Sequence, residues 1–165
     1  MSNYWIGVVS KDHVDIGVAG GYTQVNQGKA GPLERMRAGD GFAFYSPRTS
    51  YPDGEPLQAF TAIGRIRNGT VYQAVGGDPA GPFRLDVDYF PALPAPVRPL
   101  IEELTFIRSK THWGAAFRIG VLRVPEADFA LIARAMGRSF ADDFALLPAQ
   151  LSPTPAAPAS SPSST

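Results

Sequence analysis

The residues with the clearest chemical potential lie between Phe106 and Arg123, in the stretch FIRSKTHWGAAFRIGVLR. This stretch holds one of the two tryptophans, Trp113, and one of the two histidines, His112, and it contains no acidic residue. Its basic residues are Arg108, Lys110, Arg118 and Arg123. An aromatic side chain beside hydrogen-bond donors suits a pocket for a flat ligand. We expect a rigid strand to present them, because the apolar run from Phe117 to Val124 follows directly.

Patterns for catalysis are weak by comparison. A serine nucleophile would need His13 or His112 as its base, but the sequence has no Gly-x-Ser-x-Gly elbow, and Ser10 to His13 are merely consecutive. Asp86 and Asp88 share one face of an expected strand and could do acid–base chemistry, although a solvated outer face is the favoured interpretation. The sequence also lacks a Gly-x-x-x-x-Gly-Lys-Ser/Thr phosphate loop. We therefore expect no enzyme.

Metal and cofactor chemistry has equally little support. The chain has no cysteine and only two histidines, so the ligand spacings of a metal site are missing. The Gly28-Lys29 pair stands alone, which is weak evidence for phosphate binding. We predict neither a metal nor a cofactor.

Aromatic recognition is the better-supported chemistry. Trp5 lies in an apolar strand and is expected in the core, whereas Trp113 stands between polar His112 and small Gly114 and is expected to face a ligand. Stacking of a base on an aromatic ring stabilises binding by about 1–3 kcal/mol. Uncharged amides and hydroxyls would then read the edge of the base in a desolvated pocket.

Composition bounds the kind of protein. At 165 residues the chain suits one domain, and its net charge of zero argues against strong non-specific gripping of a phosphate backbone. Its 12 arginines outnumber its 3 lysines, which suits planar recognition of phosphates or bases, but a high-GC genome explains the same bias. The first residues do not resemble a signal peptide, and no run approaches the roughly 18 apolar residues of a membrane span. We expect a cytoplasmic location.

The order of elements predicts the fold class. Strands are expected at Asn3 to Ser10, Gly41 to Pro47 and Phe83 to Tyr89, and a hairpin is expected around Asn68-Gly69. Tyr22 to Lys29 is either an edge strand or a loop. Short helices are expected at Lys11 to Val18, Pro32 to Arg37, Val97 to Leu104 and Pro125 to Met136. About six strands with peripheral short helices predict an α+β protein built on a small curved sheet or β-barrel.

The C-terminal composition differs from the rest. Residues 148–165 form a Pro/Ala/Ser-rich segment without charge or aromatic side chains, which is expected to be disordered. The sequence thus predicts one domain over residues 2–147, followed by a tail.

Four segments together resemble the EVE domain family of small bacterial proteins, within the PUA-like superfamily that also holds the YTH and ASCH domains. They are Asn3 to Val14, Gly20 to Asp40, Phe44 to Pro47 and Lys110 to Val124, in the family's order. The resemblance implies a PUA-like barrel with a pocket for a base, often a modified one flipped out of nucleic acid. The pocket residues that it implies are Ser10, Lys11, His13, Tyr22, Gln24, Asn26, Lys29, Tyr45, Ser46, Trp113 and Phe117.

The resulting hypothesis is a nucleic-acid-binding module that recognises a modified base in DNA or RNA. In this hypothesis Arg108, Lys110 and Arg118 hold the backbone without reading it. Two alternatives remain open at this point. One is an ASCH-like hydrolase of modified nucleosides, with Lys11 or Lys29 activated by burial beside an acid. The other is a protein-interaction module that uses the proline-rich tail.

Overall fold

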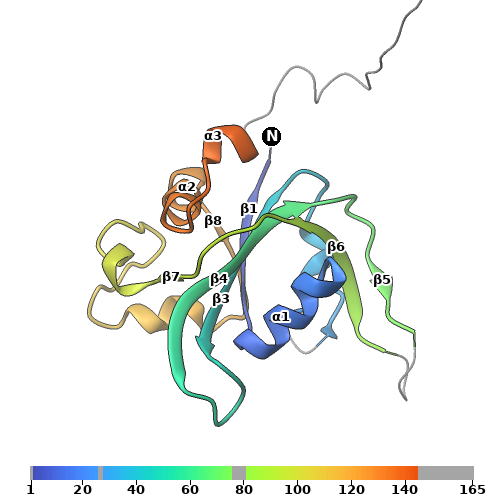
Figure 1. Ribbon diagram of the computed structural model, residues 1–165, viewed down its shortest axis with the longest axis horizontal. Helices are drawn as coiled ribbons and strands as arrows, with labels where there is room; N and C mark the ends of the chain where they lie inside the picture. The colour runs from blue at the N-terminus through green and yellow to red at the C-terminus, as the bar shows by residue number, and fades with distance from the viewer. Residues whose placement is uncertain (1, 26–27, 76–80, 145–165) are drawn as a thin grey trace, which may run out of the picture.

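A curled mixed sheet runs through the part of the chain that the computed structural model describes, residues 2–25, 28–75 and 81–144 (Figure 1). Its strands are β1 (Tyr4–Val8), β2 (Tyr22–Thr23), β3 (Gly41–Arg48), β4 (Pro56–Ile66), β5 (Tyr72–Gln73), β6 (Phe83–Tyr89), β7 (Ala95–Pro96) and β8 (Val121–Val124). The helices are α1 (Lys11–Gly20), α2 (Glu126–Ala135) and α3 (Phe140–Asp143), with 3-10 helices η2 (Leu33–Arg35), η3 (Arg98–Leu100) and η4 (Trp113–Phe117). None of the helices in these ranges has the length and apolar character needed to cross a membrane.

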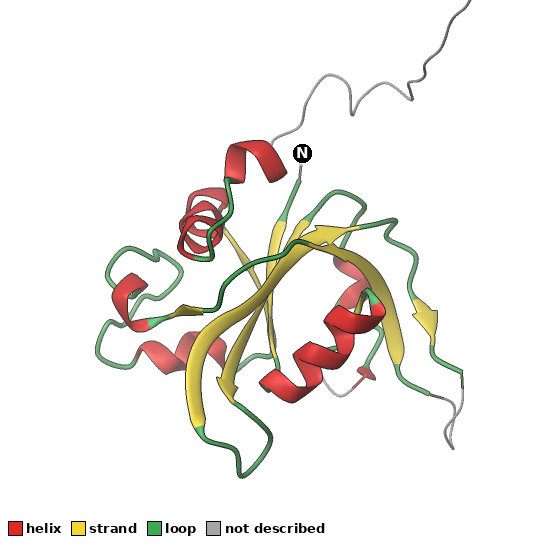
Figure 2. Cartoon of the chain, in the orientation of Figure 1, coloured by secondary structure: helices red, strands yellow, loops and turns green. Residues whose placement is uncertain are grey.

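The strand order is β2-β6-β4-β3-β1-β8, with β5 paired to β6 and β7 paired to β4. Only β1 and β3 run parallel among these pairs, and the remaining pairs are antiparallel. The long strands β4 and β6 curve around α1, so that the sheet forms a half-barrel with short helices at its periphery (Figure 2). This confirms the predicted α+β class and the PUA-like barrel. The sheet has more strands than the expected six. The additional strands include β2, β5 and β7, which contain only two residues each and are too short to show a sequence pattern.

Both faces of the central strands are covered, and this explains their nearly continuous apolar sequences. In β1, Tyr4 and Ile6 pack in one core with α2 and α3, whereas Trp5 packs in a second core with Val14 of α1. Side chains of β3 alternate in the same way. As expected, Trp5 is a core residue: it is 3% exposed, and its indole N–H donates to the buried carboxylate of Asp40 at 2.9 Å.

The predicted hairpin at Asn68-Gly69 is wrong. Gly69 does adopt the positive φ of 70° that a tight turn needs, but β4 pairs with β6 instead of β5. β6 alternates, as predicted, with Leu85 and Val87 buried. A seven-residue strand with two buried side chains has more to gain at the edge of β4 than the two exposed residues of β5.

The central basic stretch also differs from its prediction. The strand expected from Phe117 begins only at Val121, after Gly120 with a positive φ of 82°. Residues Trp113–Phe117 form the 3-10 helix η4 instead. The helix expected from Pro125 is present as α2, with Phe129 and Ile132 buried. Residues 145–147 and the predicted tail of residues 148–165 lie outside the described residues.

Candidate functional site

A pocket of about 810 Å³ opens at the carboxyl ends of the parallel strands β1 and β3; we call it the β1–β3 pocket. The β1–α1 turn, the β3–β4 turn and η4 meet there, toward the bottom of Figure 1. The pocket is lined by Val8, Val9, Ser10, His13, Gln24, Val25, Gly28, Lys29, Pro47, Arg48, Tyr51, Phe117, Arg118 and Gly120. Its volume suits a small organic ligand.

The pocket is neutral in its depth and cationic at its mouth. Ser10, Val25 and Gly28 are buried and Gln24 is half-buried, whereas Lys29, Arg48 and Arg118 are exposed. No aspartate or glutamate is among the described lining residues. Three cations without a lining acid favour an anion at the mouth, while the uncharged interior favours a neutral group with hydrogen-bonding edges.

Ser10 presents a hydrogen-bond acceptor to the pocket. Its hydroxyl donates to Oδ1 of Asp12 at 2.6 Å, and a carboxylate can only accept, so the lone pairs of Ser10 are what remains for a ligand. The backbone N–H of His13 donates to the same carboxylate oxygen at 2.9 Å. Together these bonds hold the pKa of Asp12 below its ordinary value of 3.8, with Ser10 contributing most. Asp12 therefore stays ionised, and the Ser10 proton stays engaged, at neutral pH.

Gln24 presents the opposite polarity. Its Oε1 accepts from Nε of Arg84 at 3.0 Å, and a guanidinium can only donate, so the amide NH₂ is left to donate into the pocket. Arg84 in turn lies over the ring of Tyr22, 4.0 Å from its centroid. Tyr22 is not among the lining residues, and its contact with the pocket is indirect, through Arg84 and Gln24.

Phe117 is the aromatic side chain at the floor of the pocket. It is only 6% exposed and stacks on Tyr45, with ring centroids 3.9 Å apart and an interplanar angle of 13°. Phe106 and Trp113 meet Phe117 edge-on. This packing fixes the floor in one position.

Tyr45 and Ser46 were expected to face the site because they lie near the end of a strand. In the structure both are buried and neither lines the pocket. Tyr45 is 2% exposed, and burial raises the pKa of its phenol to about 12 against a smaller opposing effect of Arg98. Ser46 is fully buried and shares a hydrogen bond with Thr61 at 2.8 Å. The reason is that β3 continues to Arg48, so these two residues are still inside the sheet.

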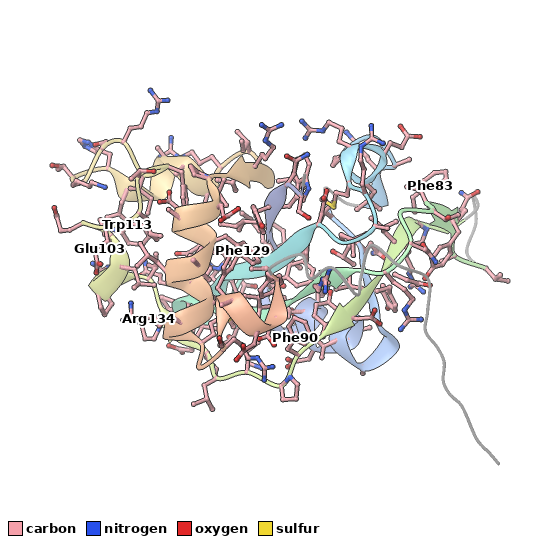
Figure 3. All side chains as sticks on the ribbon, turned by 90° about the horizontal axis from the view of Figure 1, so that it is seen from above. Phe83, Phe90, Glu103, Trp113, Phe129 and Arg134 are labelled. Atoms are coloured by element: carbon pink, nitrogen blue, oxygen red, sulfur yellow. The ribbon has the colours of Figure 1, made fainter. Side chains whose placement is uncertain are left out.

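Trp113 lies outside the lining of the β1–β3 pocket. The guanidinium of Arg98 lies 5.3 Å from its ring centroid, and the indole packs at the edge of the core that contains α2. Figure 3 shows Trp113 at the opposite end of the molecule from Phe83. The cause is the 3-10 helix: it brings Phe117, rather than Trp113, to the pocket.

Of the remaining predicted residues, some line the pocket and others do not. His13, Lys29 and Arg118 line the pocket. Lys11 does not, and it pairs with Asp15 one helical turn on at 2.8 Å. The ammonium of Lys110 donates to the carbonyls of Ile101 and Leu104 at 2.8 and 3.0 Å, so it is engaged within the protein. Asn26 lies outside the described residues.

Sequence reasoning missed Arg48 and Tyr51, which line the pocket from the β3–β4 turn. Tyr51 is 82% exposed and lies at the rim. The segment from Arg48 to Pro56 has the prolines and glycine of a surface loop, and nothing local in it indicates a ligand. Only the pairing of strands could have placed these two residues in the site. Their turn directly follows β3, and the end of β3 lies beside the end of β1.

The described residues contain no group of three or more histidine, cysteine, aspartate or glutamate side chains placed to hold a metal ion. The site as described therefore consists of apolar walls, neutral polar groups and cations.

Comparison with known protein families matches residues 3–135 to the EVE domain. The chain belongs to the EVE domain family. A UPF0310 protein of Mycolicibacterium vanbaalenii is 48% identical over 132 residues, which cover 80% of this chain and 91% of that protein. The UPF0310 protein YdcG of Bacillus subtilis is 43% identical over 136 residues, covering 82% and 93%.

Solved structures with a similar fold are more distant in sequence. Rpa0253 of Rhodopseudomonas palustris, solved by NMR, gives a TM-score of 0.53 at 18% identity and covers 82% of this EVE protein and 93% of its own chain. Atu2648 of Agrobacterium tumefaciens gives 0.53 at 13% identity, covering 84% and 95%. At such identities the likeness concerns the fold alone. The family and the half-barrel fold suggest a small binding module.

Proposed function

We propose that this EVE protein binds nucleic acid and takes one modified base of DNA or RNA into the β1–β3 pocket. The observation that carries the proposal is the separation of polarity in that pocket. Neutral Ser10 and Gln24 lie inside, and the cations Lys29, Arg48 and Arg118 lie at the mouth. A nucleotide has the same division, because its base is neutral and its phosphate is charged.

The fixed polarity of Ser10 and Gln24 adds to this match. One accepts and the other donates, and the edge of every nucleobase carries both kinds of group. The floor at Phe117 and the exposed ring of Tyr51 supply aromatic contact for the base. The added group of a modified base gains only about 0.8 kcal/mol per buried carbon, so most of the selectivity would come from the hydrogen bonds.

A binding role, rather than catalysis, is part of the proposal. The hydrolase alternative needs a lysine activated by burial, but Lys29 is exposed and the side chain of Lys11 is 37% exposed and paired with Asp15. A cytoplasmic location also belongs to this proposal.

The test is a fluorescence-anisotropy screen of the protein against short single-stranded and duplex oligonucleotides. Each carries one modified or unmodified base at its centre, and a matched oligonucleotide carries an abasic site there. We expect at least one base to bind more tightly than the abasic oligonucleotide. Gln24→Leu should remove that advantage, by about 1–3 kcal/mol, because a buried hydrogen bond is lost, and it should leave abasic binding unchanged.

Trp113→Ala tests whether Phe117 or Trp113 is the aromatic side chain that contacts the base. It should lower the free energy of unfolding by about 2 kcal/mol, as expected for partial loss of a large packed side chain, without changing the affinity per folded molecule. If no base binds better than the abasic site, or if Trp113→Ala alone removes base selectivity, the proposed pocket is wrong.

A further inference from the structure

A second groove lies beside the β1–β3 pocket and has about half its volume, about 390 Å³. It is lined by Thr105, Phe106, Arg108, Ala116, Ile119, Leu122, Arg123 and Pro125. The segment of residues 116–120 separates the two hollows. Ala116 and Ile119 line the second groove, while Phe117, Arg118 and Gly120 line the β1–β3 pocket. Ligands in the two hollows would therefore contact the same segment from different sides.

The second groove carries two arginines without an acidic partner. Arg108 and Arg123 are exposed, and neither takes part in a salt bridge within the described residues. No carboxylate is among the described lining residues. Asp128 lies beneath the groove but is 1% exposed, and its oxygens accept from Thr105 and from the backbone N–H of Phe106. The two guanidinium groups are thus available for an external anion, and their forked donors suit a phosphate.

The groove also offers apolar contact. Ile119 is 65% exposed, one of the most exposed large apolar side chains in the described residues, and half-buried Phe106 lies in the same lining. A ligand with anionic groups at intervals and apolar rings between them matches this combination. A nucleotide strand is such a ligand, whereas an acidic peptide supplies the charge without the rings.

We propose that the second groove binds the nucleotide next to the one in the β1–β3 pocket. Arg108 and Arg123 contact its phosphates, Ile119 and Phe106 contact its base or sugar, and Arg118 lies at the crossing. This inference rests on the proposed function and extends it, because it defines a footprint longer than one nucleotide. It also predicts that the protein prefers a single-stranded segment, since the neighbouring base must leave its stack to reach the groove.

The test compares two probes with the base that ranks first in the screen above. One is the mononucleotide and the other is a single-stranded pentanucleotide with that base at its centre. The double variant Arg108→Gln/Arg123→Gln should bind the pentanucleotide about tenfold or more weakly and the mononucleotide as before, because each lost contact is a charge-assisted hydrogen bond. The slope of log affinity against log salt for the pentanucleotide should fall by about 1.4, or about 0.7 for each phosphate.

Arg37→Gln/Arg134→Gln is the matched control, since both residues are exposed and absent from the lining of either hollow. It removes the same charge and should leave both affinities within about twofold, because neither residue lines a hollow and exposed charges are screened by salt. Equal losses in the two double variants would overturn the groove assignment. A pentanucleotide bound no more tightly than the mononucleotide would overturn it while leaving the proposed function intact.

Two other outcomes are informative. If wild-type protein binds neither probe, the proposed function fails and this inference fails with it. If polyglutamate competes with the pentanucleotide for the wild-type protein but not for the Arg108→Gln/Arg123→Gln variant, and Ile119→Ser leaves pentanucleotide binding unchanged, the groove recognises charge alone. The assignment to a nucleotide would then be wrong.

Discussion

At the scale of single residues, the pair Ser10 and Asp12 links the geometry of the pocket to a measurable pKa. The hydroxyl of Ser10 contributes most to the lowered pKa of Asp12. Ser10→Ala should therefore raise the pKa of Asp12 toward its ordinary value of 3.8, which an NMR titration of the side-chain carboxyl measures. The same variant should weaken base binding by about 1–3 kcal/mol, because the acceptor that Asp12 orients is lost.

Ser139→Ala is the control for this change. The hydroxyl of Ser139 accepts from the backbone N–H of Asp142 at the start of α3, at the other end of the molecule in Figure 1. It should change neither the pKa of Asp12 nor base binding. A pKa of Asp12 that stays unchanged in Ser10→Ala would contradict the orientation of the Ser10 proton given above.

At the scale of elements, Lys110 connects the segment before η4 to the turn after η3. Its ammonium donates to the carbonyls of Ile101 and Leu104, and these charge-assisted bonds satisfy backbone groups at the end of a helical segment. Lys110→Ala should lower the free energy of unfolding by about 1–3 kcal/mol in urea titrations. It should leave the salt dependence of oligonucleotide binding unchanged, in contrast to a residue that contacts the backbone of nucleic acid.

Lys11→Ala is the control for Lys110→Ala, because it removes the same charge from the exposed ion pair with Asp15. It should alter the free energy of unfolding by less than about 1 kcal/mol, as is usual for surface pairs. If Lys110→Ala instead flattens the salt dependence and leaves stability unchanged, the original prediction of a backbone-binding Lys110 is correct.

At the scale of the whole molecule, tyrosines that pack against the two cores make the fold sensitive to alkali. Burial raises the pKa of Tyr45 to about 12 and also raises that of Tyr89, from ordinary values of 10. Because the folded pKa lies above the unfolded one, this contribution to stability is complete below pH 10 and is lost as the pH rises through 12. We expect the urea midpoint to fall over this interval, together with the appearance of phenolate absorbance.

Tyr45→Phe keeps the stack on Phe117 and removes one of these ionisations, so the loss of stability should be smaller than in the wild-type protein. Tyr51→Phe, at an exposed position, should change nothing. If all six tyrosines ionise together near pH 10 with the fold intact, the raised pKa values assigned to Tyr45 and Tyr89 are wrong.

The parts of the fold that the sequence predicted are those governed by local patterns. The alternation in Phe83–Tyr89 identified β6, and the apolar spacing of Phe129, Ile132 and Met136 identified α2. Local sequence patterns did not predict which strands pair. The chain bends at Asn68 and Gly69 has a positive φ, but which strand occupies the edge of β4 depends on the apolar area that each candidate buries.

The types of side chain in the site were determined by the sequence itself: neutral amides and hydroxyls after the first strand, and arginines around Phe117. Ser10, His13, Gln24, Lys29, Phe117 and Arg118 do meet in one pocket. Only the tertiary structure decided that Trp113 lies beside Arg98, that Tyr45 lies beneath Phe117, and that Arg48 and Tyr51 join the site. The physical reason is that the parallel pairing of β1 with β3 brings together ends of strands more than 30 residues apart, and local preference carries no information about that contact.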